Sequence, residues 1–411
     1  EKVSLPGKDE DYIIQLDLTP NRSDCFSIRG IARELSISNN ILFKEPKIRS
    51  LQPNFTSSRK IKIIKEAPSY FGRTIESINN IWKELNLVQE RLQLSGFKLI
   101  NPIVDITNYV LLETGQPLHA FDDAKINGDI EVRFARNKEN IVLLDESKIT
   151  LKDDCLIIAD QSGPIALAGI MGGLSTAVDE TTTSIFLESA FFLPDIIRGK
   201  ARRYGIQTDA SIRFERGVDF KLQKYALERA SDLLSSYLGG NYGTIQDELK
   251  KINLPKLKQV SLNLDKSNKF LGTNITKTKA KKYLKGLGCE INEEKDLLIK
   301  SPSWRFDLEI YHDFVEELAR LEGYNNIPDQ SISLTSLNTF QRDYLQDIKT
   351  YLVNKGYSEL VTYSFVDPKK ANILDNTADL IVLENPISEN MSVMRSSLLS
   401  SFIETFLYNK N

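Results

Sequence analysis

Between residues 130 and 190 the chain passes through a series of short stretches rich in aliphatic and aromatic residues. The stretches are IEVRFA, IVLLD, KITL, CLIIAD, PIALAGI and SIFLESA. Runs this short are typical of strands rather than helices. A longer helical pattern follows at 220–238, and Gly239 and Gly240 end it. One face of this helix carries Leu222, Ala226, Ala230, Leu233, Leu234 and Tyr237. The combination predicts an α+β domain over 69–240.

The length of 411 residues is too great for a single hydrophobic core and predicts about three domains. The stretch EPKIRSLQPNFTSSRK, rich in Pro and Ser, leads into a predicted linker at 51–68, and a second linker is expected at 241–258. The N-terminal part, 1–50, is expected to hold a strand at YIIQLDLTP and then a helix. Ser23 or Asp24 is the expected N-cap of that helix.

Two further units are expected after the second linker. The sequence pattern of residues 259–329 predicts a small α+β domain, with one helix capped by Thr276 and another that begins near Asp313. Residues 337–411 predict an α/β unit. Its pattern is a helix at RDYLQDIKTYLVNKGY, a strand at ELVTYSFV and a further helix at the C-terminal end.

The composition disfavours several classes of protein. The net charge is −3, so any contact with nucleic acid must use local basic patches. No stretch approaches the roughly 20 apolar residues that span a bilayer, and the N-terminus lacks a signal-peptide pattern. Three widely spaced cysteines fit a reducing cytoplasm better than a zinc or disulfide framework. The chain opens on Glu1 and ends within a helical pattern, so a piece of a longer polypeptide is expected.

The residues that could carry catalysis are few. Histidine is the commonest general base, and the chain has only His119 and His312. His119 lies in the turn-like segment GQPLHAFDD, where a structural role is the simpler interpretation. The sequence contains no nucleophile elbow, phosphate-binding loop or His-Glu-x-x-His motif, which disfavours the common hydrolases and nucleoside triphosphatases.

Two features of the 69–240 domain could shape a ligand pocket. In GPIALAGIMGG, Gly169 and Gly172 follow a strand pattern and would let the backbone approach a ligand, although a tight turn is the simpler interpretation. Glu188 lies inside the apolar strand pattern IFLESAFF. A buried glutamate requires a hydrogen-bond partner or a ligand, and an ion pair with a nearby arginine is the alternative.

Charged residues of both signs are concentrated in RRYGIQTDASIRFERGVD, at 202–219. Its arginines could bind phosphates, or they could pair with the internal acids Asp209, Glu215 and Asp219.

A second charged cluster is acidic. Asp313, Glu316 and Glu317 share one face of a predicted helix, and Asp307 precedes them. Oxygen ligands suit magnesium. The alternative is that these acids are favoured near a helix N-terminus by the helix dipole.

Taken in order, these segments resemble the β chain of bacterial phenylalanyl-tRNA synthetase. The resemblance covers nearly the whole chain. It is carried by DLTPNRSDCFSIRGIARELS, VDITNYVLLETGQPLHAFD, ALAGIMGG, FLESAFF, IRGKARRYGIQTDASIRFERGVD, PSWRFDLEI…EELARLEGYNNIP and NPISENMSVMRSSLL.

The resemblance implies an α+β, multi-domain fold. It implies the end of a B1 domain at 1–50, a β-rich B3/B4 editing domain at 69–240 and a small B5 domain with helix-turn-helix-like helices at 259–329. The remaining part, 337–411, would be the truncated start of a class II synthetase-like catalytic module.

The resemblance also implies a function in protein biosynthesis. In that family a cytoplasmic (αβ)₂ heterotetramer attaches phenylalanine to tRNA(Phe), using ATP and Mg²⁺. The α chain performs the aminoacylation, and the B3/B4 domain of the β chain hydrolyses tyrosine mistakenly attached to the tRNA. The expected partners are therefore the α chain, tRNA(Phe), phenylalanine and mischarged tyrosine, without a membrane. The alternative is a non-catalytic module that binds tRNA and the α chain and has lost editing.

Motif by motif, the resemblance implies an editing pocket. The residues with expected catalytic roles are His119, Gly172, Glu188, Thr208 and Ala210. The residues expected to bind substrate are Thr107, Asn108 and Gly169. The Mg²⁺ shared with the α chain is expected at Asp307, Asp313, Glu316 and Glu317. A phenylalanine pocket rejects an added hydroxyl by only about 10²-fold, so a carboxyl such as Glu188 that binds the phenol would supply a second selection step.

Overall fold

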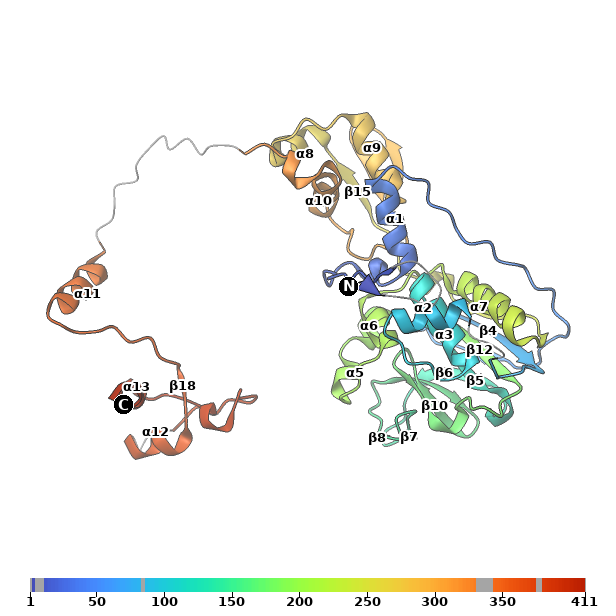
Figure 1. Cartoon of the computed structure of the whole chain (residues 1–411), viewed down its shortest axis with the longest axis horizontal. Helices are drawn as coiled ribbons and strands as arrows, with labels where there is room; N and C mark the ends of the chain where they lie inside the picture. The colour runs from blue at the N-terminus through green and yellow to red at the C-terminus, as the bar shows by residue number, and fades with distance from the viewer. Residues whose placement is uncertain (1, 4–10, 83–85, 330–342, 375–378, 411) are drawn as a thin grey trace. The chain divides into compact units, whose positions relative to one another are not determined.

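The computed structural model describes residues 2–3, 11–82, 86–329, 343–374 and 379–410. The chain divides into two compact units, residues 1–329 and 330–411, and each is described by itself (Figure 1). The units combine helices with several separate sheets, which confirms the expected α+β, multi-domain fold class.

The centre of the first unit is built from two sheets. In one sheet the strand order is β13-β4-β12-β5, β14 also pairs with β4, and all pairs are antiparallel. These strands are β4 (Ser69–Glu76), β5 (Leu118–Asp122), β12 (Ile185–Phe191), β13 (Asn241–Tyr242) and β14 (Gln246–Leu249). In the other sheet the order is β11-β10-β9-β6-β3, and only β3 and β6 run parallel. Its strands are β3 (Ile61–Lys62), β6 (Ile130–Phe134), β9 (Leu156–Asp160), β10 (Gly163–Leu167) and β11 (Met171–Gly172).

Strand β12 lies between two hydrophobic cores. Successive residues of a strand point to opposite faces. Ile185 and Leu187 belong to a core shared with the helices, whereas Phe186 and Ala190 belong to a core shared with the other sheet. The helices are α2 (Leu87–Leu94), α3 (Pro102–Thr114) and α7 (Gln223–Leu238). The domain therefore has a helical layer and two sheets, and β12 is buried on both faces because both are covered (Figure 1).

The two main helices have clear local signals. Helix α3 starts with Pro102, the Asn101 side chain accepts from the backbone N–H of Val104, and the helix ends at Gly115 with φ of 82°. The pattern predicted for α7 is confirmed, since its apolar face is largely buried and Gly239, with φ of 73°, follows its last residue.

Three short helices follow β12. They are α4 (Pro194–Ile197), α5 (Lys200–Arg203) and α6 (Asp209–Arg216). Thr208 caps α6 by accepting from the Ser211 N–H, and its hydroxyl also donates to the carbonyl of Ile170 at 2.8 Å. Thr208 thus fixes α6 to the turn between β10 and β11.

The remaining short elements of this domain lie in its connections. They are the hairpin of β7 (Asn140–Val142) with β8 (Lys148–Thr150) and the 3₁₀ turns η2 (Asp123–Lys125) and η3 (Leu174–Thr176).

The N-terminal part differs from its prediction at two points. The strand expected at YIIQLDLTP is limited to β2 (Asp11–Tyr12), which pairs with β1 (Lys2–Val3), and no described strand pairs with the residues after it. The helix α1 (Ile28–Ser38) is capped by Ser27, which accepts from the Gly30 N–H. Ser23 and Asp24 instead form the 3₁₀ turn η1 (Ser23–Cys25), so neither is the cap.

The small domain after 258 contains the sheet β15-β17-β16 and three helices. Its elements are β15 (Gln259–Leu262), α8 (Leu264–Leu271), α9 (Lys277–Gly286), β16 (Glu290–Glu293), β17 (Leu297–Lys300), α10 (Tyr311–Glu322) and η5 (Tyr324–Asn326), and the 3₁₀ turn η4 (Lys251–Asn253) lies in the segment before it. Thr276 caps α9 as predicted, and Ala280 and Leu284 are fully buried against α10 and the sheet.

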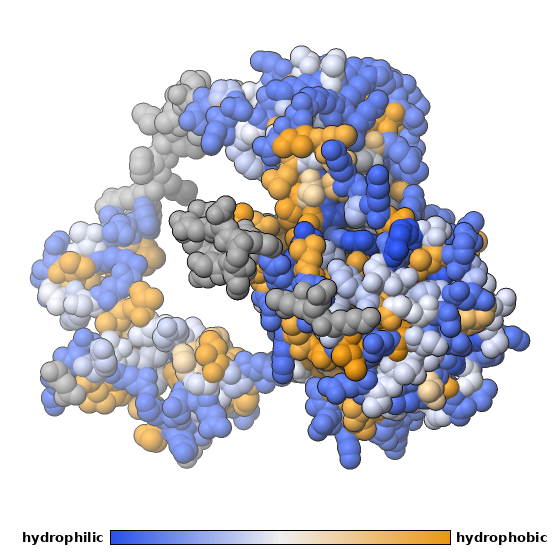
Figure 2. Space-filling model, turned by 45° about the vertical axis from the view of Figure 1, so that its right-hand side comes forward, coloured by the Kyte–Doolittle hydropathy of each residue, from blue (hydrophilic) through white to orange (hydrophobic). Residues whose placement is uncertain are grey.

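The second unit contains short elements with little buried surface. They are α11 (Tyr344–Asn354), β18 (Phe365–Val366), α12 (Pro368–Leu374), η6 (Glu389–Met391), β19 (Val393–Met394) and α13 (Leu399–Lys410). The strand expected at ELVTYSFV is limited to its last two residues. Helix α11 has no buried side chain, and its hydrophobic residues are exposed. Exposed hydrophobic residues also occur on other parts of the chain (Figure 2).

Among the helices that the structure describes, none is both long enough and apolar enough to cross a bilayer.

Candidate functional site

A cleft with about 60 Å³ of free volume lies between the two sheets of the 69–240 region. Its walls come from β5, β12, the β10–β11 turn and α6. It brings together five residues that the sequence predicts for one site: His119, Gly169, Gly172, Glu188 and Ala210. The remaining lining is apolar, and this makes the two titratable side chains, His119 and Glu188, the polar features of the cleft.

Glu188 is buried in the middle of β12, with 5% of its surface exposed. Its Oε2 accepts a hydrogen bond from the Tyr70 hydroxyl at 2.9 Å. The alternative of an arginine partner is therefore wrong. Burial raises the pKa of Glu188 to about 8, although the Tyr70 hydrogen bond acts in the opposite direction. The carboxyl group is consequently mostly protonated at neutral pH.

His119 faces Glu188 across the β5–β12 strand pair, in which the two residues are direct partners. It lies on β5 and not in a turn, which corrects the sequence interpretation. Its ring packs edge-to-face on Phe121 with centroids 4.4 Å apart. Burial lowers the pKa of His119 to about 4, so the imidazole is neutral near pH 7. A neutral imidazole can orient a water molecule or an ester oxygen, but it is a weak base at this pKa.

The two glycines are required by close packing. A Cβ atom on Gly172 would lie 2.4 Å from Cε1 of His119. Gly169 has φ of 70°, and a Cβ atom there would lie 3.1 Å from the rings of Phe192 and Phe214. The backbone of the β10–β11 turn can therefore form a wall of the cleft only because these positions lack side chains.

The other three predicted pocket residues do not line this cleft. Thr208 is the N-cap residue of α6, two residues before Ala210 in the sequence. Thr107 and Asn108 lie on α3, in the helical layer, and the Thr107 hydroxyl donates to the carbonyl of Val104 in its own helix.

Most cations in and near 202–219 are paired inside the protein. Lys200 and Arg203 both bind Asp154. Arg213 Nη1 lies 2.8 Å from Asp209 Oδ1, and this arginine is buried. Arg202 is exposed and has no recorded ion pair in the part of the chain that the structure describes. Pairing with acids inside the protein, one of the two interpretations of this stretch, thus explains most of the lysines and arginines in and near it.

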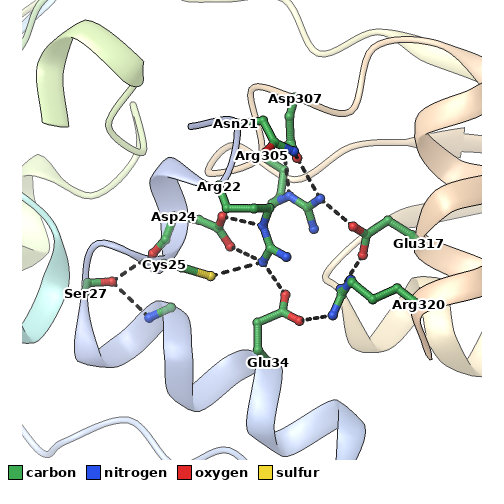
Figure 3. A network of polar contacts seen from close by, with 11 residues as sticks. Asn21, Arg22, Asp24, Cys25, Ser27, Glu34, Arg305, Asp307, Glu317 and Arg320 are labelled. Atoms are coloured by element: carbon green, nitrogen blue, oxygen red, sulfur yellow. Dashed lines mark hydrogen bonds and ion pairs between the residues drawn. The ribbon is translucent and has the colours of Figure 1, made fainter. Parts of the chain in front are cut away.

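The carboxylates predicted to bind magnesium have other partners (Figure 3). Asp307 accepts two hydrogen bonds from Arg305, at 2.8 and 2.9 Å. Glu317 binds Arg305 at 2.8 Å and Arg320 at 2.5 Å. Burial opposes ionisation of Glu317, but the two guanidinium groups prevail and lower its pKa to about 2.

The other two members of that set do not complete a site. Asp313 Oδ2 accepts from the backbone N–H groups of Glu309 and Ile310 and so caps α10, as the helix-dipole alternative proposes. Glu316 is exposed. Within the described residues no group of three or more His, Cys, Asp or Glu side chains could hold a metal ion. These four residues therefore do not fit a magnesium ion, and the expectation from the resemblance is not supported by the geometry.

Arg320 also connects α10 to the N-terminal helix α1 (Figure 3). Arg320 Nη1 lies 2.6 Å from Glu34 Oε2, and Glu34 Oε1 lies 2.5 Å from Arg22. Arg305 is almost fully buried, so its charge must be neutralised by the carboxylates that it contacts. Asp307 and Glu317 thus belong to an ion-pair network that joins two segments distant in sequence.

Sequence reasoning missed Tyr70, whose hydroxyl is the one hydrogen-bond donor to the Glu188 side chain among the residues that the structure describes. It also missed Phe214 of α6, which lines the cleft. The alternation of the β4 pattern could have placed Tyr70 on a buried face, but only the register with β12 shows which side chain it meets.

Three family models match the chain. They are the B3/4 domain over residues 66–239, the tRNA synthetase B5 domain over residues 260–324 and the phenylalanyl tRNA synthetase beta chain CLM domain over residues 326–411. A solved N-terminal fragment of the phenylalanyl-tRNA synthetase beta-subunit from Pyrococcus horikoshii is 17% identical, with a TM-score of 0.37 over 74% of this chain and 85% of the fragment.

Curated relatives match almost the entire chain. The phenylalanine–tRNA ligase beta subunit of Photorhabdus laumondii is 44% identical over 98% of this chain and 51% of its own length. The corresponding subunit of Pasteurella multocida is 45% identical over the same shares. The chain thus spans about half the length of the curated relatives it matches. By these matches and the three domain models, the chain belongs to the family of phenylalanine–tRNA ligase beta subunits.

Proposed function

We propose that this chain is the editing part of a phenylalanine–tRNA ligase and that its cleft hydrolyses tyrosine from Tyr-tRNA(Phe). In the proposed enzyme a partner α chain attaches phenylalanine to tRNA(Phe) in the cytoplasm, with ATP and Mg²⁺. Asp307, Asp313 and Glu317 are assigned no metal, because arginines and backbone N–H groups already bind them, and Glu316 is exposed beside them.

The observation that carries the proposal is the environment of Glu188. A carboxyl group with 5% exposure lines a cleft whose other side chains, apart from His119, are apolar, and its hydrogen-bond partner among the described residues is a neutral tyrosine hydroxyl and not an arginine. Such a group can form a hydrogen bond with the phenol of a bound tyrosine. A phenylalanine side chain would leave it unpaired in an apolar surrounding, which is unfavourable.

The proposed reaction is the attack of a water molecule on the ester carbonyl. The bond between the acyl carbon and the ribose oxygen breaks, and the ribose oxygen takes a proton, which gives free tyrosine and intact tRNA. His119, neutral at pH 7, is suited to orient the water or the ester. The chain's three cysteines are buried and do not line the cleft, so none is proposed as a nucleophile.

A second candidate function is a non-catalytic module that binds tRNA and the α chain. The free volume of about 60 Å³ favours it, because a phenol ring needs more space than the cleft offers in this state. Editing therefore requires the cleft to widen when the ester enters, and the β10–β11 turn and α6 are the walls that would have to move.

The two functions are separated by deacylation of Tyr-tRNA(Phe) with the chain assembled with its partner chain. Release of tyrosine that falls at least about tenfold in Glu188→Ala, with Phe-tRNA(Phe) unaffected, supports editing. The matched control is Glu180→Ala, which removes an exposed carboxylate of the same domain. Tyrosine release at the background rate in the unmodified assembly would favour the binding module.

A further inference from the structure

The two oxygens of Glu188 have different surroundings. Oε2 accepts from the hydroxyl of Tyr70, which is itself fully buried. In the described part of the chain this is the one recorded hydrogen bond of the Glu188 side chain. Oε1 is not among the fully buried polar atoms that lack a partner, and Glu188 lines the cleft. Oε1 is therefore the oxygen that a ligand in the cleft can reach.

The contact between Tyr70 and Glu188 follows from the strand register. In the β4–β12 pair, Glu188 stands opposite Gly72, and Tyr70 stands opposite Ala190. Residues two positions apart on a strand share a face, so Tyr70 and Glu188 are diagonal neighbours. Gly72 has no side chain to occupy this face, and a Cβ atom there would lie 2.1 Å from the ring of Phe186.

The direction of the hydrogen bond fixes the position of the acid proton. With Tyr70 as the donor to Oε2, a proton on Glu188 is placed on Oε1. Burial raises the pKa of Glu188 to about 8, so this proton is present at neutral pH. Oε1 then offers an O–H donor to the cleft, and after deprotonation it offers an acceptor. A phenol oxygen can pair with either form, but the ring edge of phenylalanine can pair with neither.

We propose that Tyr70 is a positioning residue for the selection of tyrosyl esters: its hydroxyl holds Oε2 of Glu188 and so presents Oε1 to the phenol of the bound residue. The proposal rests on the proposed editing function and deepens it. Tyr70 touches neither the ester nor the water, and it acts through the orientation and protonation of Glu188.

Few charged groups surround the pair. His119 faces Glu188 from β5. Arg59 is the charged side chain whose field reaches Tyr70, and it is held by Asp123 at 2.7 Å and lies over the ring of Phe186. The cleft residues from β9, β10, β11 and α6 include no titratable side chain. The effect of a substitution at Tyr70 on the protonation of Glu188 should therefore be little disturbed by other charged groups.

The test compares Tyr70→Phe with Tyr242→Phe in the assembly of this chain with its partner chain. Both substitutions keep the ring and remove one buried hydroxyl. Tyr242 donates to the carbonyl of Gly239 on the far edge of the same sheet, outside the cleft, so it is a matched control. The measurement is the release of tyrosine from Tyr-tRNA(Phe) and of phenylalanine from Phe-tRNA(Phe), as kcat and KM, between pH 6 and pH 9.

The expected result is a loss of tyrosine selectivity of about tenfold in Tyr70→Phe, mainly in KM, and no change in Tyr242→Phe. The hydrogen bond from Tyr70 lowers the pKa of Glu188, so its removal should move the pH dependence of selectivity upward. In a Glu188→Ala background, Tyr70→Phe should cause no further loss, because its effect passes through the carboxyl group.

The outcomes separate this inference from the function beneath it. If Glu188→Ala removes selectivity but Tyr70→Phe behaves like Tyr242→Phe, the positioning role is overturned and editing stands. If the unmodified assembly releases no tyrosine above background, both proposals fail. Should Tyr70→Phe be recovered only unfolded, Glu188→Gln replaces it. The amide keeps an acceptor for Tyr70 and a donor toward the cleft, so selectivity should stay within about threefold, and a loss as large as in Glu188→Ala overturns the inference.

Discussion

Gly172 and His119 are in contact across the cleft, and a methyl group on Gly172 would stand 2.4 Å from Cε1 of the imidazole. Gly172→Ala should therefore destabilise the fold by about 1–3 kcal/mol through overpacking. Urea unfolding measures this change. Most of the loss should disappear when His119→Ala is combined with it, because the clash is with the ring. An equal loss in both backgrounds would show that the strain lies elsewhere.

The stability of the domain should depend on pH through Glu188. Its pKa is about 8 in the folded chain and 4.5 in the usual case, so the unfolded chain loses this proton first as the pH rises. The folded state binds more protons at Glu188 between these values, so the contribution of Glu188 to stability falls from pH 4.5 to pH 8 by on the order of a few kcal/mol. Glu188→Gln should remove this decline in urea unfolding measured across that range.

His119 contributes in the opposite sense at lower pH. Its pKa of about 4 lies below the usual 6.5, so its contribution to stability is complete above pH 6.5 and is lost as the pH falls toward 4. The difference between the unmodified chain and Glu188→Gln isolates the glutamate, since the histidine is common to both. A difference that does not change with pH would contradict the assigned protonation.

The ion-pair network between α1 and α10 should be sensitive to Glu317. The carboxylate of Glu317 is 4% exposed and binds two arginines, so Glu317→Gln leaves the buried positive charge with one carboxylate fewer. A loss of about 3–5 kcal/mol is expected. Glu316→Gln is the matched control, because this neighbour on the same helix is exposed and its loss should stay within about 0.5 kcal/mol. Denaturant unfolding of the two variants gives the comparison.

Magnesium should not stabilise the isolated chain. Asp307 and Glu317 are occupied by Arg305 and Arg320, and a cation would have to displace these guanidinium groups. The thermal midpoint should be the same with Mg²⁺ as with an equal ionic strength of Na⁺. A thermal midpoint that rises with Mg²⁺ in the unmodified chain, but not in Asp307→Asn, would show that a metal does bind at these carboxylates.

The sequence was a good guide where the signal is local. The apolar face of α7, the glycine that ends it and the Thr276 cap of α9 depend on neighbours within one or two turns, and these predictions are confirmed. The strands at YIIQLDLTP and ELVTYSFV depend on a partner strand, and most of each segment has none among the described residues. Propensity alone cannot supply that partner.

In the cleft, too, the residues marked by their local sequence were predicted, and those that depend on a distant partner were not. Glu188 was recognisable because an acid in an apolar strand pattern needs a reason, and Gly169 and Gly172 because glycines mark close approaches. Tyr70 was not recognisable, since a tyrosine in a strand is ordinary until the register sets its hydroxyl 2.9 Å from Glu188. The acids of α10 had a suitable spacing for a metal, but spacing does not show that arginines reach them first.

Strand β12 is covered on both sides, with odd-numbered residues toward the helices and even-numbered residues toward the cleft and the second sheet. Deletion of one residue near the start of β12 would reverse the faces of the residues after it. Leu187 would then point into the cleft, and the Glu188 carboxyl would point into the hydrophobic core beneath α7. The spacing within the seven residues of β12 is therefore as much a requirement of the cleft as the identity of Glu188 is.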